Sequence, residues 1–198
     1  MIAILDYGSG NLRSAERAFE LASDEVVVTS DPKICIEADG LVVPGVGAFA
    51  ACMEQFLKID GKRIIAERVS KARPIFGICV RMQIFFDSST EKKNSDGLGI
   101  LSGGVSEIES SILPHMGWNT VNAPIESKLF AGIHEQSFYF VHSFAVKNKV
   151  AGAINSTSNY GEEFVSAVEK DFIVATQFHP EKSGNAGAIL IKNWVQSL

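Results

Sequence analysis

Residues 73–83, RPIFGICVRMQ, decide the fold, because they predict a buried strand that runs directly into a helix. Ile75, Phe76 and Ile78 follow Pro74 as an apolar run that is typical of a strand covered on both faces. The apolar positions of a short, mostly buried helix follow Cys79: Val80, Met82, Ile84, Phe85 and Phe86. A cysteine therefore stands at the junction of a central strand and a helix.

Cys79 at this junction has two interpretations. A nucleophile on such a sharp turn is exposed, and the backbone N–H of the next residue points at the atom that it attacks. The helix N-terminus also favours the thiolate over the thiol. The alternative is a buried structural cysteine, which is a frequent fate for this residue.

The composition predicts one α/β domain spanning residues 1–198. The chain is 46% hydrophobic and 21% charged, which are ordinary globular values. Its 18 basic and 23 acidic residues give a net charge of −5 and are scattered, which argues against nucleic acid or an anionic membrane as the main partner. The N-terminal stretch reaches Asp6 too early for a signal peptide, and no apolar run approaches the length of a membrane span. We therefore expect a cytoplasmic protein.

The sequence also predicts no metal and no cofactor. The three cysteines include no CxxC pair, so we interpret Cys35 as structural and Cys52 as core filling. No two of the four histidines have the spacing of metal ligands. The glycine-rich residues 44–49 match neither GxGxxG nor GxxxxGK, which argues against a nucleotide site.

Three strand–turn–helix units precede residue 75. Strands are predicted at residues 2–5, 25–29 and 40–43, and helices from residue 12 and at residues 48–57 and 61–70. This alternation predicts a mostly parallel sheet flanked by helices. Ligands on such sheets bind at the C-terminal strand ends, where both Gly45-Val46-Gly47 and Cys79 fall.

The second half of the chain predicts added antiparallel strands, which either extend the sheet or form a small flap. Short β-like runs occur at residues 104–108, 138–141, 144–146, 150–154, 164–168 and 173–177. Residues 87–97 predict a polar, mobile loop, and residues 113–119 predict a second loop that interrupts the strands. A final helix is predicted at residues 185–198.

A cysteine nucleophile needs a base within hydrogen-bond reach and a group that orients the base. His179 and Glu181 lie just past the last predicted strand with Pro180 between them. Because alternate residues of an extended backbone share a face, the two side chains project together. The alternative is an ordinary surface pair of histidine and glutamate.

These residues resemble class I, triad-type glutamine amidotransferases. The stretches that carry the resemblance are Gly77-Ile78-Cys79, Met82-Gln83 and His179-Pro180-Glu181. Further stretches, at residues 6–14, 44–49, 114–119, 139–143, 160–164 and 179–184, look like the glutaminase subunits of imidazole glycerol phosphate synthase in histidine biosynthesis. The resemblance runs essentially end to end and implies a flavodoxin-like fold.

The resemblance implies a mechanism that the residues support independently. Cys79 attacks the side-chain amide of L-glutamine, and His179 protonates the leaving ammonia. Water then hydrolyses the γ-glutamyl thioester, with His179 as base and Glu181 orienting it. The expected oxyanion donors are Val80 N–H and an amide of Gly45, Val46 or Gly47, a contribution typically worth ~3 kcal/mol each.

The family pattern also implies how the substrate is held. Gln83 and Glu91 are expected to bind the α-amino and α-carboxyl ends of glutamine, with backbone help near His142 and Ser143. For Glu91, a solvated loop carboxylate is the alternative, because it lies in the polar stretch.

Ammonia that escapes into water is protonated and lost as a nucleophile, so the site should open onto a partner. The resemblance implies a separate (β/α)₈-barrel cyclase subunit that makes imidazole glycerol phosphate and aminoimidazole carboxamide ribotide. On that analogy Asn11, Trp118 and Lys182 are interface candidates. For Trp118, core packing is the alternative.

The chain departs from the family pattern at Arg81, where a glycine is expected two residues after the nucleophile. Arg81 could point outward, could be an adaptation that depresses the pKa of the cysteine, or could fill the glutamine pocket. A crippled pocket would leave a silent regulatory subunit of the same synthase. A nearer rival is a glutaminase that feeds another synthase, such as one making an amidino sugar.

Overall fold

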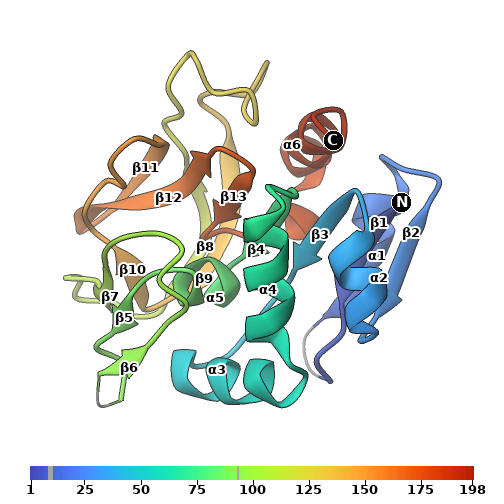
Figure 1. Ribbon diagram of the computed structural model, residues 1–198. Helices are drawn as coiled ribbons and strands as arrows, with labels where there is room; N and C mark the ends of the chain where they lie inside the picture. The colour runs from blue at the N-terminus through green and yellow to red at the C-terminus, as the bar shows by residue number, and fades with distance from the viewer. Residues whose placement is uncertain (9–10, 93) are drawn as a thin grey trace.

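The centre of the molecule is a parallel sheet, seen in the computed structural model, which describes residues 1–8, 11–92 and 94–198. Its strands lie in the order β2-β1-β3-β4-β13 and are all parallel (Figure 1). Their bounds are β1 Ile2–Leu5, β2 Val26–Thr29, β3 Gly40–Val43, β4 Ile75–Ile78 and β13 Ile173–Thr176. The predicted parallel sheet is confirmed.

Helices cover both faces of this sheet because the central strands are apolar on both sides. In β1, Ala3 and Leu5 face one core cluster while Ile2 and Ile4 face the other. The first cluster is closed by α2 Pro32–Glu37, α3 Phe49–Lys58 and α4 Gly61–Ser70, and the second by α1 Leu12–Glu20 and α6 Gly184–Val195. Within the described residues, no helix has the length and apolar character that a membrane span needs.

The second half adds strands to the edge beyond β13. The order continues β12-β10-β7-β5-β6, and β11 pairs with β12. The bounds are β5 Ser88–Ser89, β6 Ser95–Asp96, β7 Gly104–Glu107, β10 Phe144–Val146, β11 Ile154–Tyr160 and β12 Glu162–Lys170. Apart from the parallel β5–β7 pair, these neighbours are antiparallel. The expected extension of the sheet is therefore confirmed.

Two sequence predictions in this half were wrong. Residues 115–119, expected in a loop, belong to β8 His115–Thr120, which pairs with β9 Ser137–His142 in a separate two-stranded sheet. The sequence lacks the usual alternation of buried apolar and exposed polar residues here, because Met116 and Trp118 are apolar but exposed and Gly117 has no side chain. Residues 150–153, expected to be β-like, precede β11, whose polar sequence INSTSNY pairs with β12. Pairing with a buried neighbour outweighs weak intrinsic β-propensity there.

The register of the central strands positions the site. Gly77 of β4 pairs with Val43 of β3, and Ile78 pairs with Thr176 of β13. The residues that follow these pairs therefore emerge side by side at one edge of the sheet. They lead into the Gly45-Val46-Gly47 loop, the turn at Cys79 and the stretch that carries His179.

Gly77 is required because its neighbour in the core leaves no room for a side chain. A Cβ at this position would overlap the Phe85 ring, with Cζ at 2.8 Å. We expect Gly77→Ala to destabilise the protein by about 1–3 kcal/mol through overpacking, measured as the free energy of unfolding in urea. Gly104→Ala is the matched control, because a Cβ there would meet only Ser88 Oγ at 3.9 Å. Equal stability of the two variants would contradict this account.

Candidate active site

Cys79 occupies a strained turn between β4 and α5 Val80–Ile84. Its φ of 58° and ψ of −120° are rare for a residue with a side chain. The turn is held where the Cys79 N–H donates to Thr176 O at 2.7 Å. It places the sulfur at the start of α5, beside the Val80 N–H, which as the first helical amide has no partner within its own helix. This is the strand-to-helix junction that the sequence predicts.

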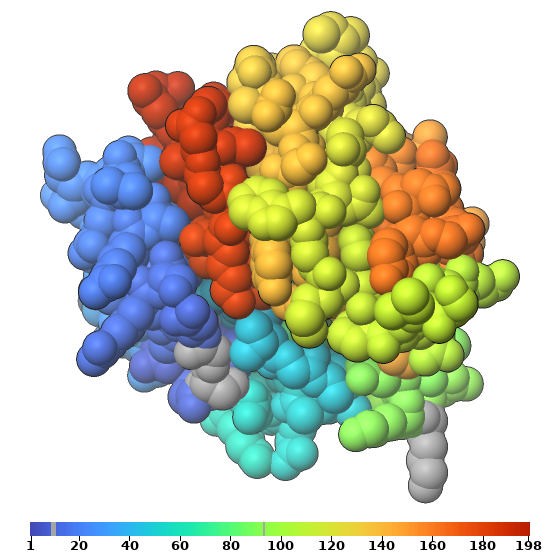
Figure 2. Space-filling model, turned by 180° about the vertical axis from the view of Figure 1, so that it is seen from behind, coloured from blue at the N-terminus to red at the C-terminus, as the bar shows by residue number. Residues whose placement is uncertain are grey.

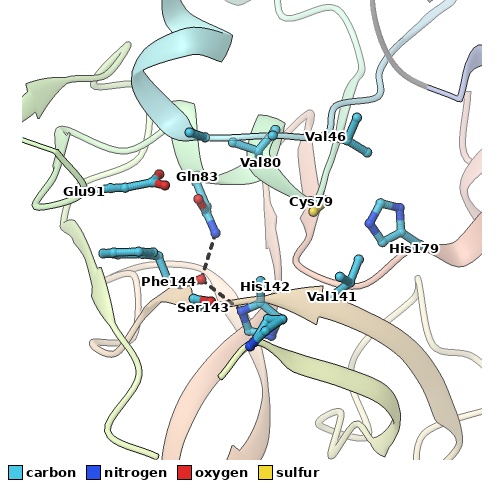
Figure 3. Close-up of a pocket in the computed structure, with 13 residues that line it drawn as sticks. Val46, Cys79, Val80, Gln83, Glu91, Val141, His142, Ser143, Phe144 and His179 are labelled. Atoms are coloured by element: carbon cyan, nitrogen blue, oxygen red, sulfur yellow. Dashed lines mark hydrogen bonds between the residues drawn. The ribbon is translucent and has the colours of Figure 1, made fainter. Parts of the chain in front are cut away.

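His179 and Glu181 form the expected pair. His179 Nδ1 lies 2.7 Å from Glu181 Oε1, and both side chains are almost fully buried. Because a carboxylate only accepts, Nδ1 donates and Nε2 is the ring nitrogen left for chemistry. Nε2 is buried without a hydrogen-bond partner of acceptable geometry among the described residues. Figure 3 shows the imidazole beside the Cys79 sulfur.

The backbone of His179 is fixed independently of its ring. Its N–H donates to Tyr139 O at 2.9 Å, and its carbonyl accepts from Ser183 Oγ at 2.6 Å. Ser183 Oγ also accepts from Tyr139 N–H at 3.0 Å. These bonds join β9 to the short 3₁₀ turn η1 Pro180–Lys182, so the imidazole is held by two segments at once.

The charges of this cluster favour the imidazolium. Burial alone acts to lower the pKa of His179, but the interactions with the neighbouring Cys79 and Glu181 outweigh it and raise the pKa to about 10. A protonated imidazole beside the cysteine is the arrangement that activates a cysteine nucleophile.

A cavity of about 320 Å³ opens beside Cys79, and its size is that of a small-molecule site. It brings together most of the predicted site residues: Val46, Gly47, Cys79, Val80, Gln83, Glu91, His142, Ser143 and His179. Gly45 and Glu181 are not part of the lining. Glu181 instead lies behind His179, on the far side from the cavity.

The Gln83 side chain is oriented by two acceptors. Its Nε2 donates to Phe144 O at 2.8 Å and to Gln177 Oε1 at 2.9 Å. This use of both N–H bonds leaves the amide oxygen of Gln83 to accept from a ligand. Gln177 was missed by the sequence prediction, although it stands two residues before His179 on the same extended stretch; its Nε2 also lies 3.9 Å from Cys79 Sγ.

Glu91 is anchored, contrary to the alternative of a solvated loop carboxylate. Its Oε2 accepts from Phe49 N–H at 2.7 Å, at the first residue of α3. The partial positive charge of a helix N-terminus favours this carboxylate. The predicted polar loop around it contains the short β5–β6 pair, which carries Glu91 to the cavity.

A chain of neutral side chains supports the opposite wall. His142 Nδ1 lies 2.9 Å from Phe144 O and must donate to it, so His142 Nε2 accepts. His115 Nδ1, at 3.0 Å, is then the donor to His142 Nε2, and Asn119 Nδ2 donates to His115 Nε2 at 3.3 Å. Burial lowers the pKa of His142 to about 3 and that of His115 to about 4, which keeps both rings neutral. The wall is therefore polar and uncharged.

Arg81 neither points outward nor fills the cavity. Its side chain is fully buried, and its guanidinium carbon lies 3.9 Å from the Tyr7 ring centroid and 5.0 Å from that of Phe56. Nη1 donates to Cys52 O at 3.1 Å, whereas Nε and Nη2 have no partner among the described residues. The arginine is absent from the cavity lining, so the pocket stays open beside it.

The three interface candidates are exposed. Trp118 is 60% exposed, which rules out the core-packing alternative, and Asn11 and Lys182 also face solvent. Met116, two residues before Trp118 on the same face of β8, is 62% exposed. In Figure 2, β8, the start of α6 and the loop after β3 meet on one face. This apolar face, defined by Met116 and Trp118, lies next to Val141 of the cavity wall.

A second hollow lies behind the triad. It is a groove of about 580 Å³ between α1 and α6, lined by Arg17, Glu181 and Ala188 among others. Glu181 Oε2 is buried and has no hydrogen-bond partner among the described residues. The orienting carboxylate therefore lies between the groove and His179.

No group of three or more histidine, cysteine or acidic side chains within the described part of the chain has the arrangement of a metal site. The cavity instead has the sulfur-bearing residue Cys79 in its lining, next to His179. A cysteine, a base at its side and a carboxylate behind the base form the constellation of an acyl-transferring cysteine enzyme. The fold and the site together define that class.

Comparison with known proteins narrows the class. A model of the family described as glutamine amidotransferase class-I matches residues 3–197. An imidazole glycerol phosphate synthase subunit HisH from Corynebacterium glutamicum is 50% identical and covers 98% of this chain and 97% of its own. Its counterpart from Mycobacterium tuberculosis is also 50% identical, covering 100% and 98%. The chain therefore belongs to the class-I glutamine amidotransferases, and within them to the HisH subunits.

Solved structures agree on the fold. The crystal structure of a glutamine amidotransferase superposes with a TM-score of 0.78 at 15% identity, covering 98% of this chain and 97% of the other. The structure of PurLQS from Thermotoga maritima gives 0.72 at 14% identity, covering 99% and 97%. At these identities the likeness supports the α/β architecture alone.

The histidines offer a direct test of the electrostatics. By NMR pH titration, we expect His179 to stay protonated through neutral pH and to lose its proton near pH 10, whereas His115 and His142 stay neutral down to about pH 4 and 3. Cys79→Ala removes the thiolate, so the pKa of His179 should fall while those of the other two rings barely change. A wild-type His179 that titrates below pH 6.5 would contradict the ion-pair account.

Proposed function

We propose that this chain hydrolyses L-glutamine through Cys79, His179 and Glu181, and supplies the ammonia to a synthase partner. The observation that carries the proposal is His179 Nε2, which is buried and has no hydrogen-bond partner among the described residues, beside Cys79 in the lining of a cavity of about 320 Å³. Membership of the HisH subunits supports glutamine as the substrate.

The first half-reaction forms a thioester. The Cys79 thiolate attacks the side-chain amide carbon of glutamine, and the carbonyl electron pair moves onto oxygen. Val80 N–H and an amide of the Gly45-Val46-Gly47 loop stabilise this oxyanion. His179 gives its Nε2 proton to the amide nitrogen, the C–N bond breaks, and ammonia leaves.

The second half-reaction regenerates the enzyme. Neutral His179 takes a proton from water, and the hydroxide attacks the thioester carbon. The C–S bond breaks to release glutamate, and the thiolate of Cys79 is restored beside the protonated imidazole. Glu181 holds the Nδ1 proton throughout and stabilises the imidazolium.

The cavity walls suit the two ends of glutamine. Glu91 supplies negative charge, and the unused amide oxygen of Gln83 supplies an acceptor, so this side suits the α-ammonium. The neutral wall at His142 and Ser143 suits the α-carboxylate, which backbone N–H groups there would bind.

We further propose that the partner is a (β/α)₈-barrel cyclase, which uses the ammonia to make imidazole glycerol phosphate and aminoimidazole carboxamide ribotide. The HisH names of the relatives support such a synthase. The exposed face with Met116 and Trp118 beside the cavity is the surface that would dock it, and Asn11 and Lys182 would extend the contact.

A silent regulatory role is the competing function, because Arg81 replaces the expected glycine. The buried position of Arg81 outside the cavity favours activity. A glutamine-analogue electrophile separates the two functions, since a silent chain should not react at Cys79 even in the complex.

Glutamate release from the complex with the cyclase and its ligand tests the activity. We expect the wild type to release glutamate and Cys79→Ser to be slower by at least about 1,000-fold, because the serine hydroxyl is not ionised by His179. A wild type as inactive as Cys79→Ser, with Arg81→Gly active, would show that the natural sequence is catalytically silent.

The docking surface can be tested separately. We expect Trp118→Ala to weaken binding to the cyclase by about 30-fold or more, as for an exposed aromatic at the centre of an interface, measured by titration calorimetry. Ile125→Ala is the control, because Ile125 is 83% exposed but follows the far end of β8. Equal losses from the two substitutions would rule out the proposed face.

A further inference from the structure

A second cysteine, Cys52, contacts the backbone of the Gly45-Val46-Gly47 loop. Cys52, on the first turns of α3, donates its thiol to Val46 O at 3.3 Å. Burial raises the pKa of Cys52, so the sulfur carries the proton that this bond needs. The structure confirms the prediction that Cys52 fills the core, and it adds a direct contact of the thiol with the loop backbone.

Arg81 contacts the backbone of the same cysteine. Its Nη1 donates to Cys52 O at 3.1 Å, and its side chain packs against the loop so closely that a Cβ on Gly45 would meet Arg81 Cγ at 2.5 Å. The Tyr7 ring stacks over the guanidinium at 3.9 Å. The arginine is therefore wedged between α3, the loop and the end of β1.

These contacts fix the direction of one peptide. The carbonyl and the N–H of a trans peptide point in opposite directions. While Cys52 holds Val46 O, the following Gly47 N–H points away from the Cys52 thiol, and both Val46 and Gly47 line the cavity. Neither Val46 N–H nor Gly47 N–H donates to another atom of the described residues. An amide without an acceptor among the described residues can donate to an oxyanion.

We propose that Cys52 and Arg81 are positioning residues that hold the Val46–Gly47 peptide with its N–H toward the reacting carbonyl of the substrate. This inference rests on the proposed glutaminase function and deepens it. Arg81 acts through Cys52 and through its contact with Gly45; neither residue touches the substrate. The arginine that departs from the family pattern thereby supports the oxyanion site.

The experiment compares kcat and KM for glutamate release by the complex with the cyclase and its ligand. Cys52→Ala and Arg81→Met remove the two hydrogen bonds, and we expect each to lower kcat about tenfold with KM within twofold, a fraction of the loss seen when an oxyanion donor is deleted. Cys52→Ser keeps a donor to Val46 O and should restore most of kcat. Cys35→Ala is the matched control, because among the described residues that buried thiol donates only to Thr29 O, away from the loop.

Alkylation of Cys79 by iodoacetamide, followed by peptide mass spectrometry, gives the second readout. This displacement forms no oxyanion, so Cys52→Ala and Arg81→Met should react at the wild-type rate. Unchanged kcat in both variants would overturn the proposal, as would parallel losses in kcat and alkylation, which indicate a purely structural role. If the wild type itself releases no more glutamate than Cys79→Ser, the proposed function fails instead, and the inference fails with it.

Discussion

The positive φ of Cys79 is the constraint on which the rest of the site depends. A helix that simply continued from β4 would carry the sulfur into the core, whereas this turn presents it at the edge of the sheet. The strain, of order 1–3 kcal/mol, persists because the segment is fixed on both sides. Thr176 O holds the Cys79 N–H, and the bare Cα of Gly77 lets Phe85 pack against β4.

Two buried arginines secure the two ends of that central strand. Arg68 of α4 donates to Pro74 O at 2.6 Å, directly before β4, and to Ala38 O at 2.9 Å, two residues before β3. Arg81, in α5 and three residues past the end of β4, packs against Gly45 in the loop that follows β3. Neither guanidinium is paired with a carboxylate in the described structure, so the charge is compensated by carbonyl dipoles and aromatic faces. The parallel pair that carries the nucleophile and its loop is thus fastened by backbone contacts at either end.

The sequence was sufficient to predict the elements that depend on residues close together in the chain. Central strands are continuous apolar runs, and Cys79 and His179 each follow one, so the sheet and the triad could be predicted. The strand at Trp118 could not, because its outward face is apolar and its partner lies about twenty residues away. The position of Arg81 was also beyond prediction, since α3, the loop and Tyr7 come together only in the folded chain. Gln177 and Cys52 were missed for the same reason: their contacts are long-range.

The groove between α1 and α6 borders Glu181, on the side of this residue that faces away from the cavity at Cys79. Glu181 separates this groove from His179, while glutamine would enter from the opposite side. A molecule lodged in the groove would change the dielectric around the carboxylate, and hence the proton affinity of the imidazole, without displacing the substrate. Kinetically it would lower the maximal velocity and leave the apparent affinity for glutamine intact.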